Sequence, residues 1–248
     1  SIILYGSSKM GFRTQKPTLI ILIAVLLAYF GHNFENLIRQ ERAGIFDKSS
    51  KYDEAIFSSE DIIGLPIVVQ KWMSYSGVIG KARISNVFLS QDLQLKFKPE
   101  QKEWNYGTAE QYFTVNPPAF NWDIHTQMNP LLSVIGRDKF EDGKAEMLIK
   151  LLGIIPVADA KNDGKVNQSA LQRYLAEIVW FPSAALSEYL IWEEVDERSA
   201  KATLDYKGTN GSGIFYFNEM GQFEKFVAMR FKDPSDTEPI EWKVIANK

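Results

Sequence analysis

The feature that most constrains the fold is a helix-like segment, residues 167–186, that separates two long runs of strand-like sequence. Its apolar residues follow the i, i+3, i+4, i+7 spacing of a helix with one buried face: Leu171, Tyr174, Leu175 and Ile178. Asn167 or Ser169 can cap the start of this helix, and Pro182 should end it. One long helix between two runs of strands predicts an α+β fold, because βαβ units would alternate strands and helices.

The opposite face of the same helix carries Arg173, Glu177 and Trp180, which are also one helical turn apart. A surface helix rarely exposes a tryptophan beside an ion pair, so we expect both faces to be covered. In that position Arg173 and Glu177 could bind a polar head group in a cavity, or simply help the helix pack on a sheet. The ion pair alone contributes only about 0.2–0.5 kcal/mol, so it does not decide between the two.

Strand-like segments fill the rest of the predicted domain. Before the helix they occupy residues 82–91, 93–98, 109–115, 119–128, 131–140 and 144–149, and after it residues 191–195, 200–206, 213–217 and 222–231. Turn signals separate them at Lys98-Pro99, Asn116-Pro117-Pro118, Asn129-Pro130 and Asp142-Gly143. Asn210-Gly211 is the strongest hairpin signal. We therefore expect a curved antiparallel sheet, half-barrel-like, wrapped around a central helix.

An apolar segment near the N-terminus, residues 19–30, contains no charge. Lys9, Arg13 and Lys16 precede it, whereas residues 35–61 hold four basic and seven acidic residues, so the positive-inside rule places the body of the protein outside the cytoplasm. With its uncharged neighbours the segment would cover about 21–27 Å as a helix, against a hydrocarbon core of about 30 Å. An uncleaved signal anchor, a cleaved signal peptide and a buried core helix are all open; we prefer the anchor.

These segments divide the chain into three parts. Residues 1–34 form the signal anchor or signal peptide, residues 35–56 a polar stem, and residues 57–248 a single α+β domain. The sequence begins at Ser1 and stops directly after the strand-like EWKVIA, so we expect the natural domain to continue at its C-terminal end. The expected location is the membrane, with the body extracytoplasmic; a periplasmic or secreted protein, after signal cleavage, is the alternative.

Composition excludes several classes of function. The net charge of −3 gives nucleic-acid binding no electrostatic support. The absence of cysteine excludes disulfides, thiolate catalysis and Cys-ligated zinc, and a total of two histidines argues against other zinc sites. We therefore expect no metal and no cofactor.

Candidate site residues come from the helix and the aromatic strands. An apolar pocket inside a curved sheet, or alternatively a packed aromatic core, is expected from Phe120, Trp122, Trp180, Phe181 and Trp192. Asp138 could be a site carboxylate, although a turn or a pair with Arg137 or Arg230 would also explain it. His125 shares a strand face with Asp123, but no GxSxG elbow accompanies it and no catalytic residue is assigned. The ligand-binding candidates are Arg173, Glu177, Trp180, Trp122, Phe120, Trp192 and Asp138.

Five separated segments occur in one order: GLPIVVQKWMSYSGVIGKARI, AEQYFTVNPPAFNW, GRDKFEDGKAEMLIKLLGIIPVADA, LQRYLAEIVWFPSAAL and FNEMGQFEKFVAMRF. Together they resemble a family of bacterial proteins, often with an N-terminal membrane segment, that is defined only as a domain of unknown function. The resemblance covers residues 58–232 and implies family membership and export, but no activity. In shape, the sheet–helix–sheet order is similar to the half-barrels of periplasmic lipoprotein carriers, an analogy that transfers no residue.

Three functions are consistent with these features. The leading interpretation is a membrane-tethered or exported protein that binds a lipid or another apolar ligand in a cupped sheet. One alternative is a hydrolase that uses carboxylates such as Asp138 and Glu177. The other is a structural or interaction domain of the cell envelope.

Overall fold

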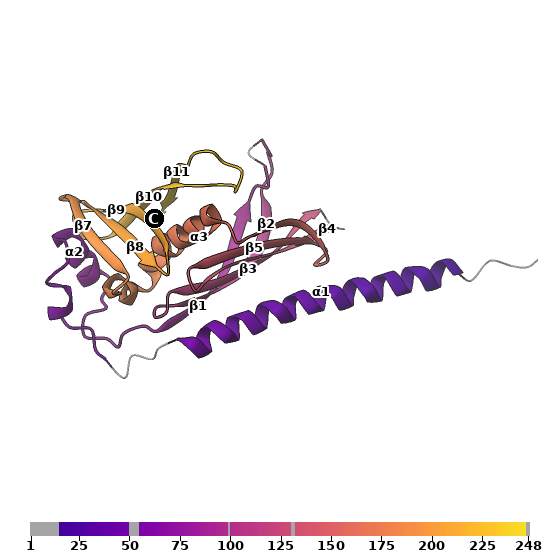
Figure 1. The fold of residues 1–248 in the computed structure, drawn as a ribbon, viewed down its shortest axis with the longest axis horizontal. Helices are drawn as coiled ribbons and strands as arrows, with labels where there is room; N and C mark the ends of the chain where they lie inside the picture. The colour runs from indigo at the N-terminus through magenta and orange to yellow at the C-terminus, as the bar shows by residue number, and fades with distance from the viewer. Residues whose placement is uncertain (1–14, 50–54, 99, 130–131, 247–248) are drawn as a thin grey trace, which may run out of the picture.

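The computed structural model describes residues 15–49, 55–98, 100–129 and 132–246 (Figure 1). In this part of the chain, two antiparallel sheets enclose a helix, which confirms the predicted α+β class. Lys9 and Arg13 of the N-terminal cations, and Pro99 and Pro130 of two predicted turns, lie outside the described residues.

The first sheet has six strands in the order β1-β2-β3-β4-β5-β6: β1 (Asn86–Leu95), β2 (Asn105–Thr114), β3 (Ala119–Asn129), β4 (Leu132–Glu141), β5 (Lys144–Leu151) and β6 (Ile155–Lys161). The second has five strands in the order β11-β10-β9-β8-β7: β7 (Leu190–Asp196), β8 (Ser199–Tyr206), β9 (Thr209–Phe217), β10 (Phe223–Arg230) and β11 (Ile240–Ile245). Two separate sheets therefore take the place of the single wrapped sheet that the sequence predicts. Residues 82–98 contribute one strand, β1, instead of two, and β6 was not predicted.

The central helix α3 (Gly164–Glu177) begins earlier than its sequence suggests. Its N-cap is Asp163, whose side chain accepts hydrogen bonds from the backbone N–H groups of Lys165 and Val166. Asn167, predicted as a cap, instead accepts a hydrogen bond from the backbone N–H of Ala145 in β5 (2.8 Å). The predicted capping position is therefore wrong, because tertiary packing uses the Asn167 side chain. Two 3₁₀ turns follow the helix, at Ile178–Trp180 and Pro182–Leu186.

A close approach between α3 and β9 explains a second difference. The predicted Asn210-Gly211 hairpin turn is wrong: the turn lies at Lys207 and Gly208, which have φ angles of 48° and 81°. Gly211 lies inside β9, where a Cβ atom would be 2.8 Å from Cγ of Gln172. The glycine therefore serves helix packing, and the turn forms at the left-handed pair before it.

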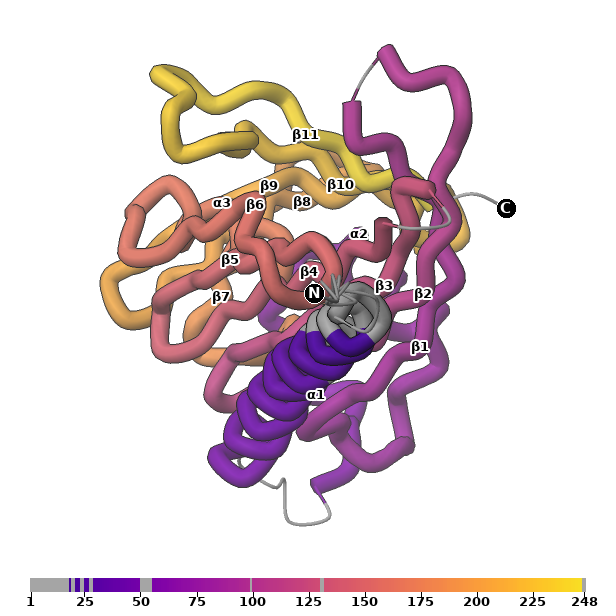
Figure 2. Tube along the Cα trace, turned by 90° about the vertical axis from the view of Figure 1, so that its right-hand side faces the viewer, coloured from indigo at the N-terminus to yellow at the C-terminus, as the bar shows by residue number. Residues whose placement is uncertain are grey.

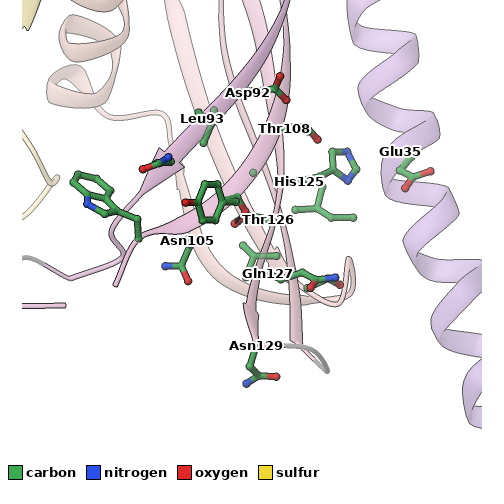
Figure 3. Close-up of a pocket in the computed structure, with 16 residues that line it drawn as sticks. Glu35, Asp92, Leu93, Asn105, Thr108, His125, Thr126, Gln127 and Asn129 are labelled. Carbon is green, nitrogen blue, oxygen red and sulfur yellow. Dashed lines mark hydrogen bonds between the residues drawn. The ribbon is translucent and has the colours of Figure 1, made fainter. Parts of the chain in front are cut away.

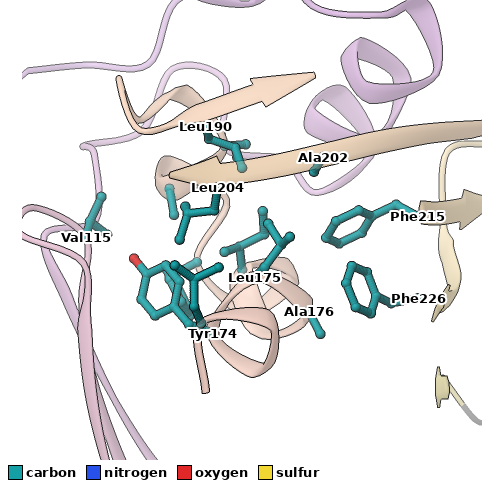
Figure 4. Packing of buried hydrophobic residues seen from close by; sticks show 14 of the residues in the cluster. Val115, Tyr174, Leu175, Ala176, Leu190, Ala202, Leu204, Phe215 and Phe226 are labelled. Atoms are coloured by element: carbon teal, nitrogen blue, oxygen red, sulfur yellow. The ribbon is translucent and has the colours of Figure 1, made fainter. Parts of the chain in front are cut away.

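The core fills the space on both sides of α3 (Figure 4). Tyr174 lies on the side of Val115, and its hydroxyl donates a hydrogen bond to the carbonyl of Thr114 (2.9 Å). Ala176 lies on the side of Phe215 and Phe226 of the second sheet. On the opposite face, Arg173 and Glu177 are largely buried as expected, whereas Trp180, on which the expectation was based, is 43% exposed. A 3₁₀ turn at Glu60–Ile62 adds Ile62 to the same core, and the short helix α2 (Ile67–Tyr75) adds Trp72.

The long helix α1 (Gln15–Lys48) lies on the outer face of the first sheet, opposite α3, and its N-terminal half runs past the sheets (Figures 1 and 2). Phe34, Ile38 and Ile45 are buried. Exposed apolar side chains lie further towards the N-terminus: Ile21, Leu22, Val25, Leu26, Tyr29 and Phe30. No helix within the described ranges is both long enough and apolar enough to cross a membrane.

Buried charges hold the C-terminal half of α1 to the sheet. Arg42 pairs with Asp123 of β3 and with Glu110 of β2 (2.6 Å), and Glu41 pairs with Arg137 of β4 (3.1 Å). Arg42, Asp123 and Arg137 are buried. The part of the predicted polar stem that lies in α1 is therefore packed against the body of the protein.

Candidate functional site

A row of side chains crosses the inner face of the first sheet, facing α3. Gln111 of β2 pairs with Trp122 of β3, Trp122 with Asp138 of β4, and Asp138 with Met147 of β5. Side chains of directly paired residues lie on the same face of a sheet, so the strand register sets polar and apolar groups next to each other. Ala160 of β6 continues the row to the sheet edge.

The helix α3 places Arg173 and Glu177 over this row. Arg173 Nη1 lies 2.8 Å from Oδ2 of Asp138, and Nε lies 3.2 Å from Oε1 of Glu177. The three side chains are only 16%, 17% and 13% exposed, respectively. One guanidinium therefore bridges two carboxylates in the interior. The predicted pair Arg173–Glu177 exists, and the partner of Asp138 is Arg173.

Amide and aromatic side chains complete this buried network. Gln111 Nε2 donates to Oε2 of Glu177 (2.8 Å), and Trp122 Nε1 donates to Oε1 of Gln91 (3.0 Å). The Arg173 guanidinium lies over the ring of Trp122, 4.6 Å from its centroid. These contacts satisfy and orient the charges, which a buried ion pair requires if it is not to destabilise the fold.

Burial changes the acid–base properties of the network. It raises the pKa of Glu177 above its ordinary value, because the carboxylate loses water, although Arg173 opposes the shift. Burial also disfavours the charged form of Arg173, but the charges of Glu177 and Asp138 outweigh it, so the pKa of Arg173 is raised. Arg173 therefore stays charged and is committed to the two carboxylates.

The remaining sequence candidates are distributed over different places. Phe120 is fully buried, with the Arg173 guanidinium 5.3 Å from its ring centroid. Trp180 is exposed at the end of α3, with its ring centroid 6.2 Å from that of Phe113. Trp192 lies on β7 of the second sheet, where it packs against Trp72 and Phe215. The structure thus brings five candidates together, Arg173, Glu177, Asp138, Trp122 and Phe120, and leaves Trp180 and Trp192 apart.

Strand alternation also separates Arg137 from Asp138. Arg137 points to the outer face, where it contacts Glu41 and Glu146, so it cannot pair with Asp138 on the inner face. His125 likewise lies on the outer face, 3.4 Å from Asp123, as its alternation predicts.

A cleft opens where the two sheets diverge beside the N-terminal half of α3. Its volume is about 350 Å³, at the lower end of the range for ligand pockets, roughly 300–1,000 Å³. Asp138 lies at one wall, so the cleft reaches the buried network. The apolar part of its lining consists of Met147, Ala160, Val166, Ala170, Phe231, Pro234, Ile240 and Trp242.

Arg230, the last residue of β10, is the main polar group of the cleft. Its Nε donates to the carbonyl of Ser169 (3.1 Å), and its guanidinium lies over the ring of Trp242, 4.5 Å from the centroid. Among the described residues, Nη1 and Nη2 make no hydrogen bond or ion pair. Burial lowers the pKa of Arg230, against the opposing effect of Asp138. This cation is therefore partly desolvated without a bound carboxylate.

The other charges of the cleft are engaged or peripheral. Lys165 Nζ donates to the carbonyls of Pro234 (3.0 Å) and Asp236 (2.6 Å). The exposed rim carries Lys232, Asp233 and Glu241. Inside the cleft, a ligand would therefore meet the charges of Arg230 and Asp138, and Asp138 is already paired with Arg173.

Sequence reasoning named Arg230 only as a partner for Asp138 and did not single out Trp242. Alternation along β10 puts Arg230 on the same face as Ala228, opposite Met229. The register with β11, in which Arg230 pairs with Ile240 and Ala228 with Trp242, was needed to put the indole beside the guanidinium.

A second, wider depression of about 1230 Å³ lies beside α1, at the ends of β1, β2 and β3 (Figure 3). His125 points towards Glu35 of α1, and Asp92 and Thr108 lie nearby. The depression is open, and both polar and apolar side chains from the two faces of the first sheet line it. No group of three or more His, Asp or Glu side chains in the described parts of the chain is placed to hold a metal ion.

Comparison with known proteins identifies a family for the chain but no activity. No curated protein and no solved structure shows significant similarity to the chain. A family model described as a family of unknown function, DUF6920, matches residues 63–248, which include α2, α3 and both sheets. The match confirms the predicted resemblance to a family of unknown function. Because it spans most of the chain, the protein belongs to this family of unknown function, DUF6920.

Proposed function

We propose that the protein is a membrane-attached binding protein that holds an amphipathic molecule with an anionic group in the cleft between its sheets. The observation that carries the proposal is Arg230: a partly desolvated guanidinium, stacked on Trp242, with two nitrogens, Nη1 and Nη2, that donate no hydrogen bond to any described residue. A carboxylate or phosphate would receive two charge-assisted hydrogen bonds there. The apolar lining would accommodate the adjoining chain at about 0.8 kcal/mol per buried methylene.

The rest of the interior supports this location over a deeper one. The aromatic residues that the sequence suggested as a pocket, such as Phe120 and Phe181, are fully buried in the core around α3. In the cleft, apolar surface, an available cation and an opening to solvent coincide.

The test is a binding titration of the full chain, purified in mild detergent, with a fluorescent long-chain fatty acid. Arg230→Gln should weaken binding by roughly 10- to 150-fold, since a hydrogen bond to a charged group contributes about 1.5–3 kcal/mol. The matching fatty alcohol should bind weakly and respond little to Arg230→Gln, and inorganic phosphate should compete poorly because it lacks the chain. Arg198→Gln, at an exposed arginine in the turn between β7 and β8, is the matched control. Absence of binding to wild type, or equal binding by Arg230→Gln, would refute the proposal.

Membrane attachment is the second part of the proposal. The exposed apolar side chains on the N-terminal half of α1, together with the three cations that precede residues 19–30, support an anchor with the body outside the cytoplasm. Trypsin added to spheroplasts of an expressing bacterium should then degrade the body. Protection until the membrane is lysed would reject this orientation.

A hydrolase that uses Asp138 and Glu177 is the alternative, and the raised pKa of Glu177 favours it, because a general acid must hold its proton near neutral pH. Arg173 bridges both carboxylates, however, which suits a structural role. Release of free acid from an ester of the same chain by wild type, but not by Glu177→Gln, would favour the hydrolase.

A further inference from the structure

The connection between β5 and β6 is apolar where a hairpin tip is usually polar. Leu152 and Gly153 have φ angles of 53° and 70°. A branched apolar residue seldom adopts this left-handed conformation, which asparagine or glycine normally occupies. Ile155 is 53% exposed, and Pro156 and Val157 after it are also exposed. The chain thus accepts backbone strain at this turn and presents apolar side chains to its surroundings.

This turn lies directly against α1. A Cβ atom on Gly153 would be 3.0 Å from Cα of Gly31, so the two backbones touch. Phe30, Phe34, Lys150 and Ile154 line a small hollow of about 170 Å³ between the helix and the turn. The turn is therefore fixed at the level of Gly31 along the helix axis.

Gly31 also lies where the sequence of α1 changes from apolar, on its N-terminal side, to polar. Tyr29 and Phe30 are exposed, with ring centroids 5.6 Å apart, and exposed aliphatic residues extend from them towards the N-terminus. Aromatic side chains gather at the level of lipid head groups. With a helical rise of about 1.5 Å per residue, the contact at Gly31 lies within roughly 3 Å of this aromatic pair. The Lys150 ammonium lies 4.3 Å from the ring centroid of Phe34, a position from which it can reach lipid phosphates.

We propose that the β5–β6 turn is a second membrane contact, which inserts Ile155 and Val157 into the interface of an anionic phospholipid bilayer beside α1. The bilayer is the occupant that fits, because the turn contacts α1 at Gly31, the level at which the exposed apolar side chains of the helix begin. The inference rests on the membrane attachment proposed above, but not on ligand binding.

Two contacts would fix the body of the protein relative to the bilayer, which a single helix cannot do. β6 runs from the turn to the cleft, where Ala160 forms part of the wall. Ala160 is five positions after Ile155, about 17 Å along the strand at a rise of 3.4 Å per residue. The cleft would then open close to the lipid head groups, in the position from which an amphipathic ligand could enter it.

Because the chain has no cysteine, single cysteine labels can test this directly in the full chain. Ile155→Cys and Leu26→Cys, each carrying an environment-sensitive fluorophore, would be reconstituted into vesicles of phosphatidylcholine and phosphatidylglycerol (3:1). Ile191→Cys is the matched control, because Ile191 is an apolar residue, 65% exposed, on β7 of the other sheet. Nitroxide lipids should quench the labels at 155 and 26 at least twofold and leave the label at 191 unchanged.

Each other outcome overturns the inference in a distinguishable way. Quenching at 26 without quenching at 155 keeps the anchor and rejects the turn as a contact. Absence of quenching at both positions rejects the membrane attachment as well. A concentration-dependent blue shift of the label at 155 in detergent, without quenching by nitroxide lipids, assigns the surface to a second copy of the chain. Val157→Cys repeats the test with a second exposed position, in case a label at 155 disturbs the turn.

Discussion

Removing the cation between the two buried carboxylates is the sharpest test of the network around α3. Arg173→Met keeps an unbranched apolar stem over Trp122 but leaves Asp138 and Glu177 without their shared partner. Breaking a buried ion pair by removing one partner costs about 3–5 kcal/mol, because the remaining charge is uncompensated. Since all three side chains are less than one fifth exposed, we expect a loss in this range at pH 8.

The loss should depend on pH with a defined sign. The pKa of Glu177 is already raised above its ordinary value of 4.5 by burial, and Arg173 opposes that shift. Without Arg173 the folded pKa rises further, so the folded variant binds more protons than the unfolded chain in the pH range above 4.5. Stability then falls as pH rises, and the variant should be closer to wild type at pH 5 than at pH 8.

Urea unfolding, followed by tryptophan fluorescence at both pH values, measures these differences. Adding Glu177→Gln to Arg173→Met should recover part of the loss at pH 8. Lys201→Met removes an exposed ion pair with Glu193 (2.9 Å) and should cost less than about 1 kcal/mol at either pH. The reasoning fails if Arg173→Met lies within about 1 kcal/mol of wild type at pH 8, or if its deficit is equal at the two pH values.

Backbone positions give further predictions that the same unfolding assay checks. Gly211→Ala should destabilise the fold by about 1–3 kcal/mol, because its Cβ would lie 2.8 Å from Gln172 and 3.0 Å from Leu171. Gly44→Ala in α1, with no atom within 4 Å of the new Cβ, should instead stabilise it by about 0.5–1 kcal/mol; a loss there would contradict the helix. Asp163→Ala should cost about 1 kcal/mol through the lost N-cap of α3, and an unchanged stability would show that the cap contributes nothing.

The sequence predicted the parts of the site that depend on local spacing. The helical period placed Arg173 and Glu177 together, and alternation placed Trp122 opposite His125. The Asp142-Gly143 turn lies where it was predicted and pairs Glu141 with Lys144. Because of this register, Asp138 lies beside Met147. These relations extend over a few residues, so pattern and turn chemistry determine them.

Longer-range relations were not predictable in the same way. The β3–β4 pairing contains a register shift between Gln127 and Asn129. The pairing of Trp122 with Asp138 could therefore not be predicted by counting residues outward from the β3–β4 turn. Asn210-Gly211 has a strong turn preference, but packing against α3 overrides it. The division into two sheets, and with it the cleft at Arg230, depends on how the sheets meet across the helix, which no local pattern encodes.

The order of strands has a consequence for how the chain folds. Within each sheet every hydrogen-bonded pair of strands is also adjacent in sequence. Such local pairing closes short loops and favours rapid folding, and on the ribosome the first sheet can form before α3 and the second sheet emerge. During that interval the inner face of the first sheet, including Trp122 and Phe120, is exposed to solvent without its helix. The chain is therefore most prone to aggregate before α3 has docked on the first sheet. Variants that slow this docking should reduce the yield of folded protein more than their equilibrium stability suggests.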